Sequence, residues 1–181
     1  LGRTENMSII ASLQGVLPQD RISTHPDQLA VVAHDESTLS GVTPLAVIWP
    51  LTIDEISQIV RACVQQKTPI TTRGAGSALE GSTIPCNGGI VVDVSRMTRI
   101  LNYWPDDLQI EIESGIIYDH LNNHLKRDGL FFPPSPGCSG DIATIGGMVS
   151  TNASWIYSVK YGGTREYVLA LTVVTGTGEV I

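Results

Sequence analysis

The sequence contains few basic residues and no long hydrophobic run. Only 11 of its 181 residues are Lys or Arg, against 18 Asp and Glu, so the formal net charge is −7. This balance argues against a nucleic-acid-binding protein, because such proteins neutralise phosphates with Lys and Arg. No apolar run approaches the roughly 20 residues that a membrane-spanning helix needs, and no basic and then apolar signal segment opens the chain.

Cysteine is also scarce. Cys63, Cys86 and Cys138 are odd in number and show no CxxC spacing, which argues against a disulfide framework or a zinc ribbon. Unpaired cysteines fit a reducing compartment, and we therefore expect a cytoplasmic protein. Cys138 is expected to be a small buried filler rather than a reactive thiol.

Hydrophobic periodicity predicts an α+β chain in two lobes. Thr52 and Glu55 form a capping-box pattern at the start of one amphipathic helix. We expect helices over residues 8–16, 52–66 and 117–127, and strands over 45–49, 68–72, 90–94, 108–113, 130–132 and 167–175. The expected division is an N-terminal extension and helix over residues 1–40, a first lobe over 41–100 and a second, incomplete lobe over 101–181.

The most informative segment follows the strand predicted over residues 68–72. It contains Gly74, Gly76 and Gly81 among small residues, and such a loop can turn its amides toward an anion. It fails two nucleotide signatures, because Leu79 replaces the third glycine of the dinucleotide fingerprint and Ser82 replaces the P-loop lysine. The alternative is a turn-rich connection that binds no ligand.

A second segment of similar character runs from Thr144 through Gly146 and Gly147 to Asn152. Two such segments suggest a long ligand with two phosphates, and a dinucleotide is the natural candidate. The alternative is a tight helix start, with Thr144 as the N-cap and the glycines allowing close packing.

Other residues carry weaker signals. His120 and His124 have the spacing of a zinc-protease motif, but Leu121 stands where that motif needs glutamate. We therefore expect an exposed helix face and no metal site. Trp155 and Tyr157 could stack on a flat ring, although core packing is the usual role of such side chains.

With these segments placed, the chain resembles the FAD-binding domain of the vanillyl-alcohol oxidase (PCMH-type) flavoprotein superfamily. Within it, the chain is most similar to the branch of D-lactate dehydrogenases and the glycolate oxidase FAD subunit. The resemblance covers nearly everything from about residue 40 onward. The matching segments are Trp49-Pro50, Arg73–Gly81, Val92–Met97, Pro133–Pro136, Thr144–Met148, Asn152-Ala153 and Lys160–Val168.

The resemblance implies FAD as the cofactor, sandwiched in extended form between the two lobes. The first loop would wrap the FAD pyrophosphate, and the later segment would run along the rest of the cofactor. Ser77 stands where covalent family members carry histidine, which implies non-covalent binding. The implied FAD-binding residues are Arg73, Gly74, Ala75, Gly76, Ser77, Ala78, Leu79, Pro134, Ser135, Pro136, Gly137, Thr144, Gly146, Gly147 and Asn152; no catalytic residue is implied. Ser154-Trp155 departs from the usual Gly-Gly of the family.

The implied activity is oxidation of a small 2-hydroxy acid of the D-lactate or glycolate type, with electrons passed to a quinone, a cytochrome or a partner subunit. Two alternatives stay open: a non-catalytic FAD-holding or electron-relay subunit, or another FAD oxidoreductase on the same fold, such as an alcohol or sugar oxidase or a cell-wall precursor reductase. A peripheral association with the inner face of a membrane is a further option.

The resemblance also bears on the extent of the chain, which ends at Ile181 within a predicted strand. The family's FAD domain continues beyond this point, and its substrate-binding cap domain follows. We therefore expect a C-terminally truncated FAD domain without its cap. Such a fragment should be inactive alone and should bind FAD weakly or not at all.

Overall fold

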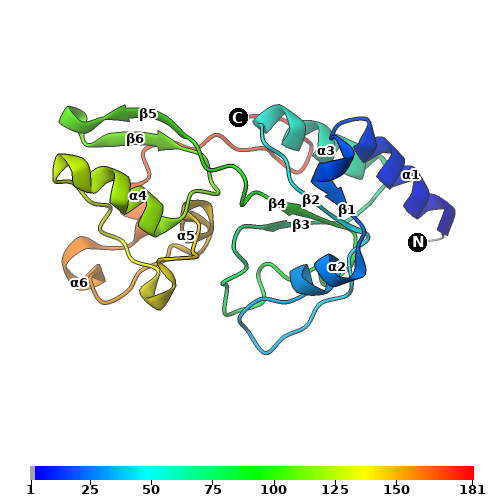
Figure 1. The fold of residues 1–181 in the computed structure, drawn as a ribbon, viewed down its shortest axis with the longest axis horizontal. Helices are drawn as coiled ribbons and strands as arrows, with labels where there is room; N and C mark the ends of the chain where they lie inside the picture. The colour runs from blue at the N-terminus through cyan, green and yellow to red at the C-terminus, as the bar shows by residue number, and fades with distance from the viewer. Residues whose placement is uncertain (1–2) are drawn as a thin grey trace. The chain divides into compact units, whose positions relative to one another are not determined.

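The computed structural model describes the backbone of residues 3–181 and the side chains of residues 9–181. The chain divides into two compact units, each described here by itself (Figure 1). The first unit runs to Val94 and also includes Thr172–Ile181, while the second unit is Ser95–Leu171. Both units combine helices and strands, so the expected α+β class is confirmed. Within the described residues, no helix is long and apolar enough to cross a membrane.

A four-stranded sheet forms the centre of the first unit. Its strands are β1 (Ile22–Ser23), β2 (Ala46–Ile48), β3 (Ile70–Arg73) and β4 (Ile90–Asp93), in the order β1-β2-β4-β3. Strands β2, β4 and β3 are parallel, and β1 pairs antiparallel with β2 at one edge. The residues of β2 and β4 are all buried, which explains why these strands are mainly apolar, β-branched runs rather than alternating patterns.

Helices cover both faces of this sheet. Helices α1 (Arg3–Gln14) and α3 (Ile53–Gln65) pack on the face that presents Ile48 and Ile90, and α2 (Pro26–Val32) packs on the face that presents Val47 and Val91. Figure 1 shows α1 and α3 together on one side of the sheet and α2 on the other. The alternation of strand side chains therefore supplies two separate hydrophobic contacts.

Helix α3 begins where the sequence predicts, with a modified cap. Thr52 Oγ1 accepts a hydrogen bond from the Glu55 amide at 3.2 Å, which is half of the predicted capping box. The Glu55 carboxylate instead accepts from the Leu51 amide at 2.7 Å and from both terminal nitrogens of Arg21 at 2.7 and 2.8 Å. The ion pair therefore joins the chain before β1 to the start of α3.

The strand predicted over residues 167–175 is not formed. A short 3-10 helix occupies Thr164–Tyr167, and only an isolated bridge joins Val174 to Val180. Only residues 173–175 of the predicted strand pair, and their partners are residues 179–181 just beyond the next turn. The turn that follows packs on α3, because Ser57 Oγ and Arg61 Nε donate to the Gly178 carbonyl at 2.5 and 3.1 Å.

The second unit is built on a β-hairpin and three helices. Strands β5 (Ile100–Trp104) and β6 (Gln109–Ile112) pair antiparallel, and the helices are α4 (Tyr118–Leu125), α5 (Ile145–Thr151) and α6 (Ser158–Tyr161). A 3-10 turn over Lys126–Asp128 extends α4. The core is formed by the buried side chains of Ile116, Leu121, Leu125, Ile145 and Met148. The sequence pattern did not predict β5.

The short strand predicted over residues 130–132 is wrong. The Leu130 amide donates to the Leu125 carbonyl at 3.2 Å, and the Phe132 amide donates to the Asn122 side chain at 2.8 Å. The end and one side of α4 thus provide the hydrogen bonds that a neighbouring strand would otherwise supply, so the segment stays irregular.

Candidate functional site

The loop after β3 depends on two glycines with positive φ. Gly76 has φ of +74° and Gly81 has φ of +79°, values that residues with a Cβ rarely adopt. Space imposes a second requirement at Gly76, because a Cβ there would overlap the guanidinium of Arg73. Glycine at this position therefore permits both the turn and the close approach of Arg73.

Arg73 is buried at the end of β3, with 8% of its surface exposed. Its Nη1 donates to the His34 carbonyl at 2.6 Å. Burial lowers the pKa of the guanidinium, while the charges of Asp93, Asp35 and Glu36 oppose that shift. A guanidinium stays charged under such conditions, so Arg73 places a fixed positive charge against the glycine loop.

The loop amides are open. Within the part of the chain that the structure describes, the amides of residues 74–78 donate no hydrogen bond to the protein. The next amide, that of Leu79, donates to the Glu80 carboxylate at 3.1 Å. The Ala78 carbonyl accepts from the Glu36 amide at 3.1 Å and thereby holds the loop from its other side. Five unused donors beside a buried cation form an arrangement suited to a phosphate group.

An acidic residue also borders this loop. Burial raises the pKa of Asp35, but hydrogen bonds from Ser37 and the charge of Arg73 outweigh that effect and hold the pKa below its usual range. The Ser37 amide donates to Asp35 Oδ1 at 2.9 Å. Asp35 Oδ2 is buried without a hydrogen-bond partner. The loop therefore borders a charged carboxylate with one unused oxygen.

In the second unit, Pro134 and Ser135 are buried and lead into a turn at Gly137. Ser135 Oγ accepts from the Gly137 amide at 3.2 Å, and Gly137 has φ of +75°. A Cβ on Gly137 would lie 3.4 Å from the indole of Trp155. Trp155 is 53% exposed and therefore lies on this turn rather than in the core where such a side chain is usually found.

The second glycine segment forms the start of α5. Thr144 is the N-cap, as the alternative reading of the sequence has it, and its Oγ1 accepts from the Gly147 amide at 3.3 Å. The Ile145 and Gly146 amides donate to the carbonyls of Ile116 and Ser114 at 2.9 and 2.8 Å. These amides are thus already used within the protein, in contrast to those of residues 74–78.

Asn152 ends α5 in the left-handed conformation, with φ of 49°. Its Oδ1 accepts from the Arg165 amide at 2.8 Å. The neighbouring Thr164 is fully buried, and both its amide and its hydroxyl donate to the Ala153 carbonyl. The sequence alone assigns no role to Thr164, although the residue lies within Lys160–Val168, one of the segments that resemble the family.

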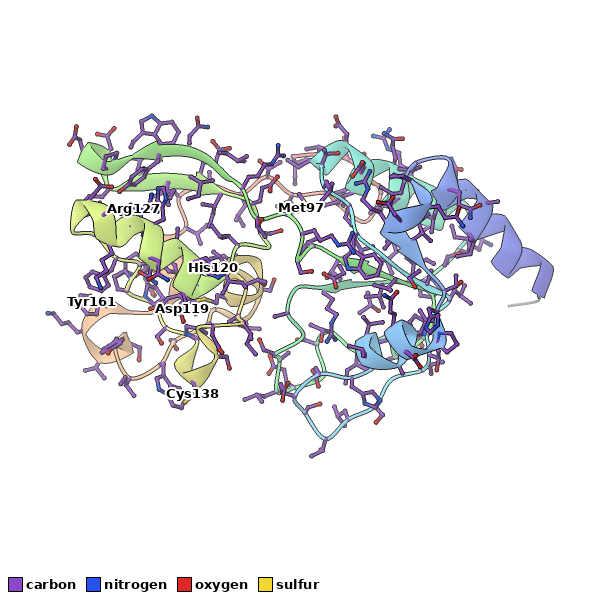
Figure 2. All side chains as sticks on the ribbon, in the orientation of Figure 1. Met97, Asp119, His120, Arg127, Cys138 and Tyr161 are labelled. Atoms are coloured by element: carbon purple, nitrogen blue, oxygen red, sulfur yellow. The ribbon has the colours of Figure 1, made fainter. Side chains whose placement is uncertain are left out.

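The structure brings the predicted site residues together in two groups. Residues 73–79 form one loop in the first unit, and the group from Pro134 to Asn152 lies in the second unit. Cys138 is exposed on a 3-10 turn, so the expectation of a buried filler is wrong (Figure 2). Tyr157 is also exposed rather than packed in the core.

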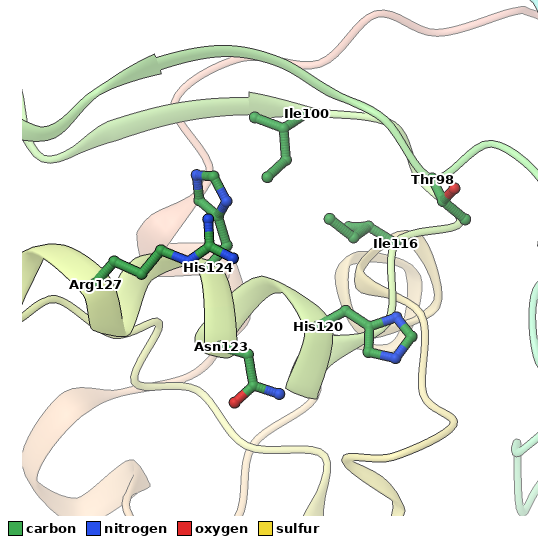
Figure 3. A pocket seen from close by; sticks show the side chains of 7 residues that line it. All are labelled: Thr98, Ile100, Ile116, His120, Asn123, His124 and Arg127. Carbon is green, nitrogen blue, oxygen red and sulfur yellow. The ribbon is translucent and has the colours of Figure 1, made fainter.

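A groove of about 440 Å³ lies in the second unit, between the start of the hairpin and α4 (Figure 3). Ile100 and Ile116 provide its apolar part. Its polar lining consists of Thr98, His120, Asn123, His124 and Arg127. The sequence predicted an exposed helix face at the two histidines, and His120 is indeed exposed. It gave no sign that Thr98, Asn123 and Arg127 share this surface with them.

Comparison with known proteins identifies the cofactor. Residues 44–181 match the family model described as the FAD binding domain. The chain belongs to this family. Its cofactor is FAD, as the resemblance in the sequence implied.

Two relatives narrow the comparison. The chain is 36% identical over 149 residues to D-lactate dehydrogenase of Anaerostipes hadrus, covering 82% of the chain and 31% of the relative. It is 37% identical over 151 residues to glycolate oxidase subunit GlcD of Bacillus subtilis (strain 168), covering 83% and 32%. The chain thus spans about a third of the length of these relatives.

A solved structure confirms the fold. The match to p-cresol methylhydroxylase covers 100% of the chain and 36% of that protein, with a TM-score of 0.83 and 20% sequence identity. The chain therefore has the vanillyl-alcohol oxidase (PCMH-type) FAD-binding fold.

Proposed function

We propose that the chain is the FAD-binding part of a flavin-dependent oxidoreductase that oxidises a small 2-hydroxy acid of the D-lactate or glycolate type. The observation that carries this proposal is the loop at residues 74–78, whose amides are open beside the buried Arg73. The names of the relatives support the substrate class, because they are a D-lactate dehydrogenase and a glycolate oxidase subunit.

The first loop fits a pyrophosphate. The amides of residues 74–78 would donate to its oxygens, and Arg73 would stabilise its negative charge from the buried side of the loop. The missing Cβ at Gly76 keeps the loop backbone close to the guanidinium. Ser77 offers a hydroxyl and no imidazole, so we propose that FAD is held without a covalent bond.

The second group would contribute differently. Because the amides of Ile145, Gly146 and Gly147 are used inside the unit, helix α5 would act as a packed support rather than as an amide cradle. We propose that the buried turn Pro134–Gly137 and the end of α5 at Asn152 line the remainder of the cofactor. Gly137 brings the exposed indole of Trp155 against this turn.

When bound, FAD supplies the two-electron acceptor for a hydride from the carbon that bears the substrate hydroxyl. We propose no residue of this chain as the proton acceptor for that step. The electrons would pass to a quinone, a cytochrome or a partner subunit rather than to oxygen, and GlcD is itself named as a subunit. A cytoplasmic location, with peripheral contact to the membrane that holds a quinone, would suit this route.

The domain division into residues 1–40, 41–100 and 101–181, with a substrate-binding cap contributed by further chain, is part of the same proposal. Its consequence is that residues 1–181 alone would bind FAD weakly or not at all and would not turn over substrate. Fewer cofactor contacts would then have to offset the cost of ordering FAD.

The test uses the protein purified from its native source. We expect FAD that acid precipitation releases completely, and reduction of an artificial electron acceptor with D-lactate, glycolate or D-2-hydroxyglutarate. Activity on a simple alcohol or a sugar, with none on the three acids, would contradict the substrate class. Absence of flavin and of any affinity for FAD would contradict the whole proposal.

A further inference from the structure

The groove between the start of the hairpin and α4 contains none of the predicted FAD-binding residues. We propose that it binds a small organic anion that carries carboxylate or phosphoryl groups. This inference does not depend on the oxidoreductase proposal, because it rests on the lining of the groove alone.

The first argument is charge. Arg127 lines the groove and forms no ion pair among the described residues. Two carboxylates near the groove lining in the sequence bind other side chains: Glu113 binds Arg99 at 2.7 Å, and Asp128 Oδ2 accepts from the Tyr103 hydroxyl at 2.8 Å. A third, Asp119, precedes His120 in the first turn of α4. In a chain of net charge −7, the groove therefore presents a cation without a partner.

The second argument is the supply of hydrogen-bond donors. Within the described residues, the side chains of Thr98, His120 and Asn123 make no hydrogen bond to the protein. Together with the guanidinium of Arg127, they offer hydroxyl, imidazole and amide donors around the apolar Ile100 and Ile116. A volume of about 440 Å³ suits a small organic ligand, and a few polar groups on an apolar floor are typical of such sites.

The third argument is that the donors stand on a rigid element. Leu121 and Leu125 are buried and fix one side of α4 in the core. His120, His124 and Arg127 are spaced four and three residues apart, so they share another side of the same helix. Figure 2 shows His120 and Arg127 at the two ends of this helix. The backbone that carries these three side chains is thus fixed by packing in the core.

Tyr103 of β5 adds a second support. Its ring lies edge-on to His124 with centroids 5.2 Å apart, and its hydroxyl binds Asp128, the residue after Arg127. One aromatic side chain therefore positions the imidazole and restrains the turn that carries the guanidinium.

A metal ion is a poorer occupant. Figure 3 shows the imidazoles of His120 and His124 pointing in different directions. No group of three His, Cys, Asp or Glu side chains that could hold a metal occurs in the described part of the chain. Arg127 would also repel a cation in the same groove.

The test is calorimetric titration of the 181-residue chain at low ionic strength with inorganic phosphate, with citrate and with uncharged glycerol. We expect one site for at least one of the two anions, with a Kd of about 1 mM or tighter, and none for glycerol. Stronger phosphate binding would indicate a phosphorylated ligand, and stronger citrate binding a polycarboxylate.

Two variants separate this site from general charge attraction. Arg127→Gln should weaken anion binding by about tenfold, because it removes a charged donor. Lys126→Gln removes the same charge from the adjacent residue outside the groove and should change binding by less than about twofold. Equal losses in both variants, or a Kd weaker than about 1 mM for both anions, would overturn the proposal. FAD affinity should be the same in both variants, so a failure here leaves the proposed function untouched.

Discussion

The guanidinium of Arg73 occupies the space that a Cβ on Gly76 would fill. One residue ends a parallel strand, and the other turns the loop back over it with a positive φ. The pair explains in physical terms why a glycine loop without a P-loop lysine can still carry positive charge. The charge comes from beneath the loop, through a buried side chain that bonds the His34 carbonyl at 2.6 Å.

A first prediction concerns the glycines of α5. A Cβ on Gly146 would lie 2.7 Å from Ser114 Cβ and 2.8 Å from the Ser114 carbonyl, whereas one on Gly147 would lie 3.1 Å from the Thr144 hydroxyl. Gly146→Ala should therefore lower the free energy of unfolding by about 2 kcal/mol, because backbone must move. Gly147→Ala should change it by less than about 1 kcal/mol, because the helix propensity of alanine offsets the contact.

Urea denaturation followed by circular dichroism measures both α5 variants. Equal stability of the two proteins would show that Gly146 is not required for packing. It would then favour the alternative that the amides of this segment bind the cofactor.

The turn that docks on α3 offers a matched pair of glycines. Gly178 has φ of +79°, and a Cβ there would lie 2.8 Å from the Ser57 carbonyl. Gly176 lies in the same turn with open space around it. Gly178→Ala should cost about 1–3 kcal/mol of stability, and Gly176→Ala should fall within about 0.5 kcal/mol of the parent.

Thermal unfolding and limited proteolysis test this pair. Cleavage near Thr175 should increase only in Gly178→Ala, since the bonds from Ser57 and Arg61 to the Gly178 carbonyl would be lost. If Gly176→Ala is cleaved as readily, the docking of the turn does not depend on Gly178.

The Arg21–Glu55 pair predicts a dependence of stability on pH. The hydrogen bond from Arg21 lowers the pKa of Glu55, and it outweighs burial, which acts in the opposite direction. A carboxyl group whose pKa is lower in the folded protein stabilises the fold at pH values above its pKa in the unfolded chain, which is about 4.3. This contribution disappears as the pH falls through the pKa of the folded protein. Glu55→Gln should lose about 1–2 kcal/mol at pH 7 and should approach the parent at about pH 3.

Glu111→Gln is the control, because the Glu111 carboxylate accepts from Asn102 on the exposed hairpin. Denaturation curves between pH 3 and pH 7 measure the free energy of unfolding of the parent, Glu55→Gln and Glu111→Gln. A constant difference between the parent and Glu55→Gln across this range would contradict the assigned pKa direction.

Much of the first unit follows from local pattern. The helix predicted over residues 52–66 and the strands predicted over 45–49 and 90–94 are present as α3, β2 and β4. In each element the pattern of apolar residues matches its burial: the strands are apolar runs buried on both faces, and the helix repeats apolar residues at steps of three and four because it is buried on one face. The sequence predicts Thr52 as the N-cap. It does not predict the contact of Glu55 with Arg21, because these residues are 34 positions apart.

The errors share a cause. Residues 130–132 and 167–175 have strand-like composition, but strands need a partner, and the first segment finds its hydrogen bonds on α4 instead. The open amides of residues 74–78 and the used amides of α5 come from similar glycine-rich sequences. The difference is that the α5 amides bond Ser114 and Ile116, which are about 30 positions away in the sequence, and no local pattern predicts such bonds.

The most direct test of the cofactor loop compares two glycine variants in an FAD titration of the 181-residue chain, followed by flavin fluorescence. Gly76 and Gly129 have φ of +74° and +71°, but a Cβ on Gly129 meets nothing within 4 Å. Alanine at either position therefore carries a similar backbone strain of about 1–2 kcal/mol, and only Gly76→Ala displaces Arg73. We predict weak binding by the parent, with a Kd above about 1 µM, equal binding by Gly129→Ala, and at least tenfold weaker binding by Gly76→Ala. Measurable FAD binding with the same Kd in all three proteins would contradict the assignment of FAD pyrophosphate to this loop.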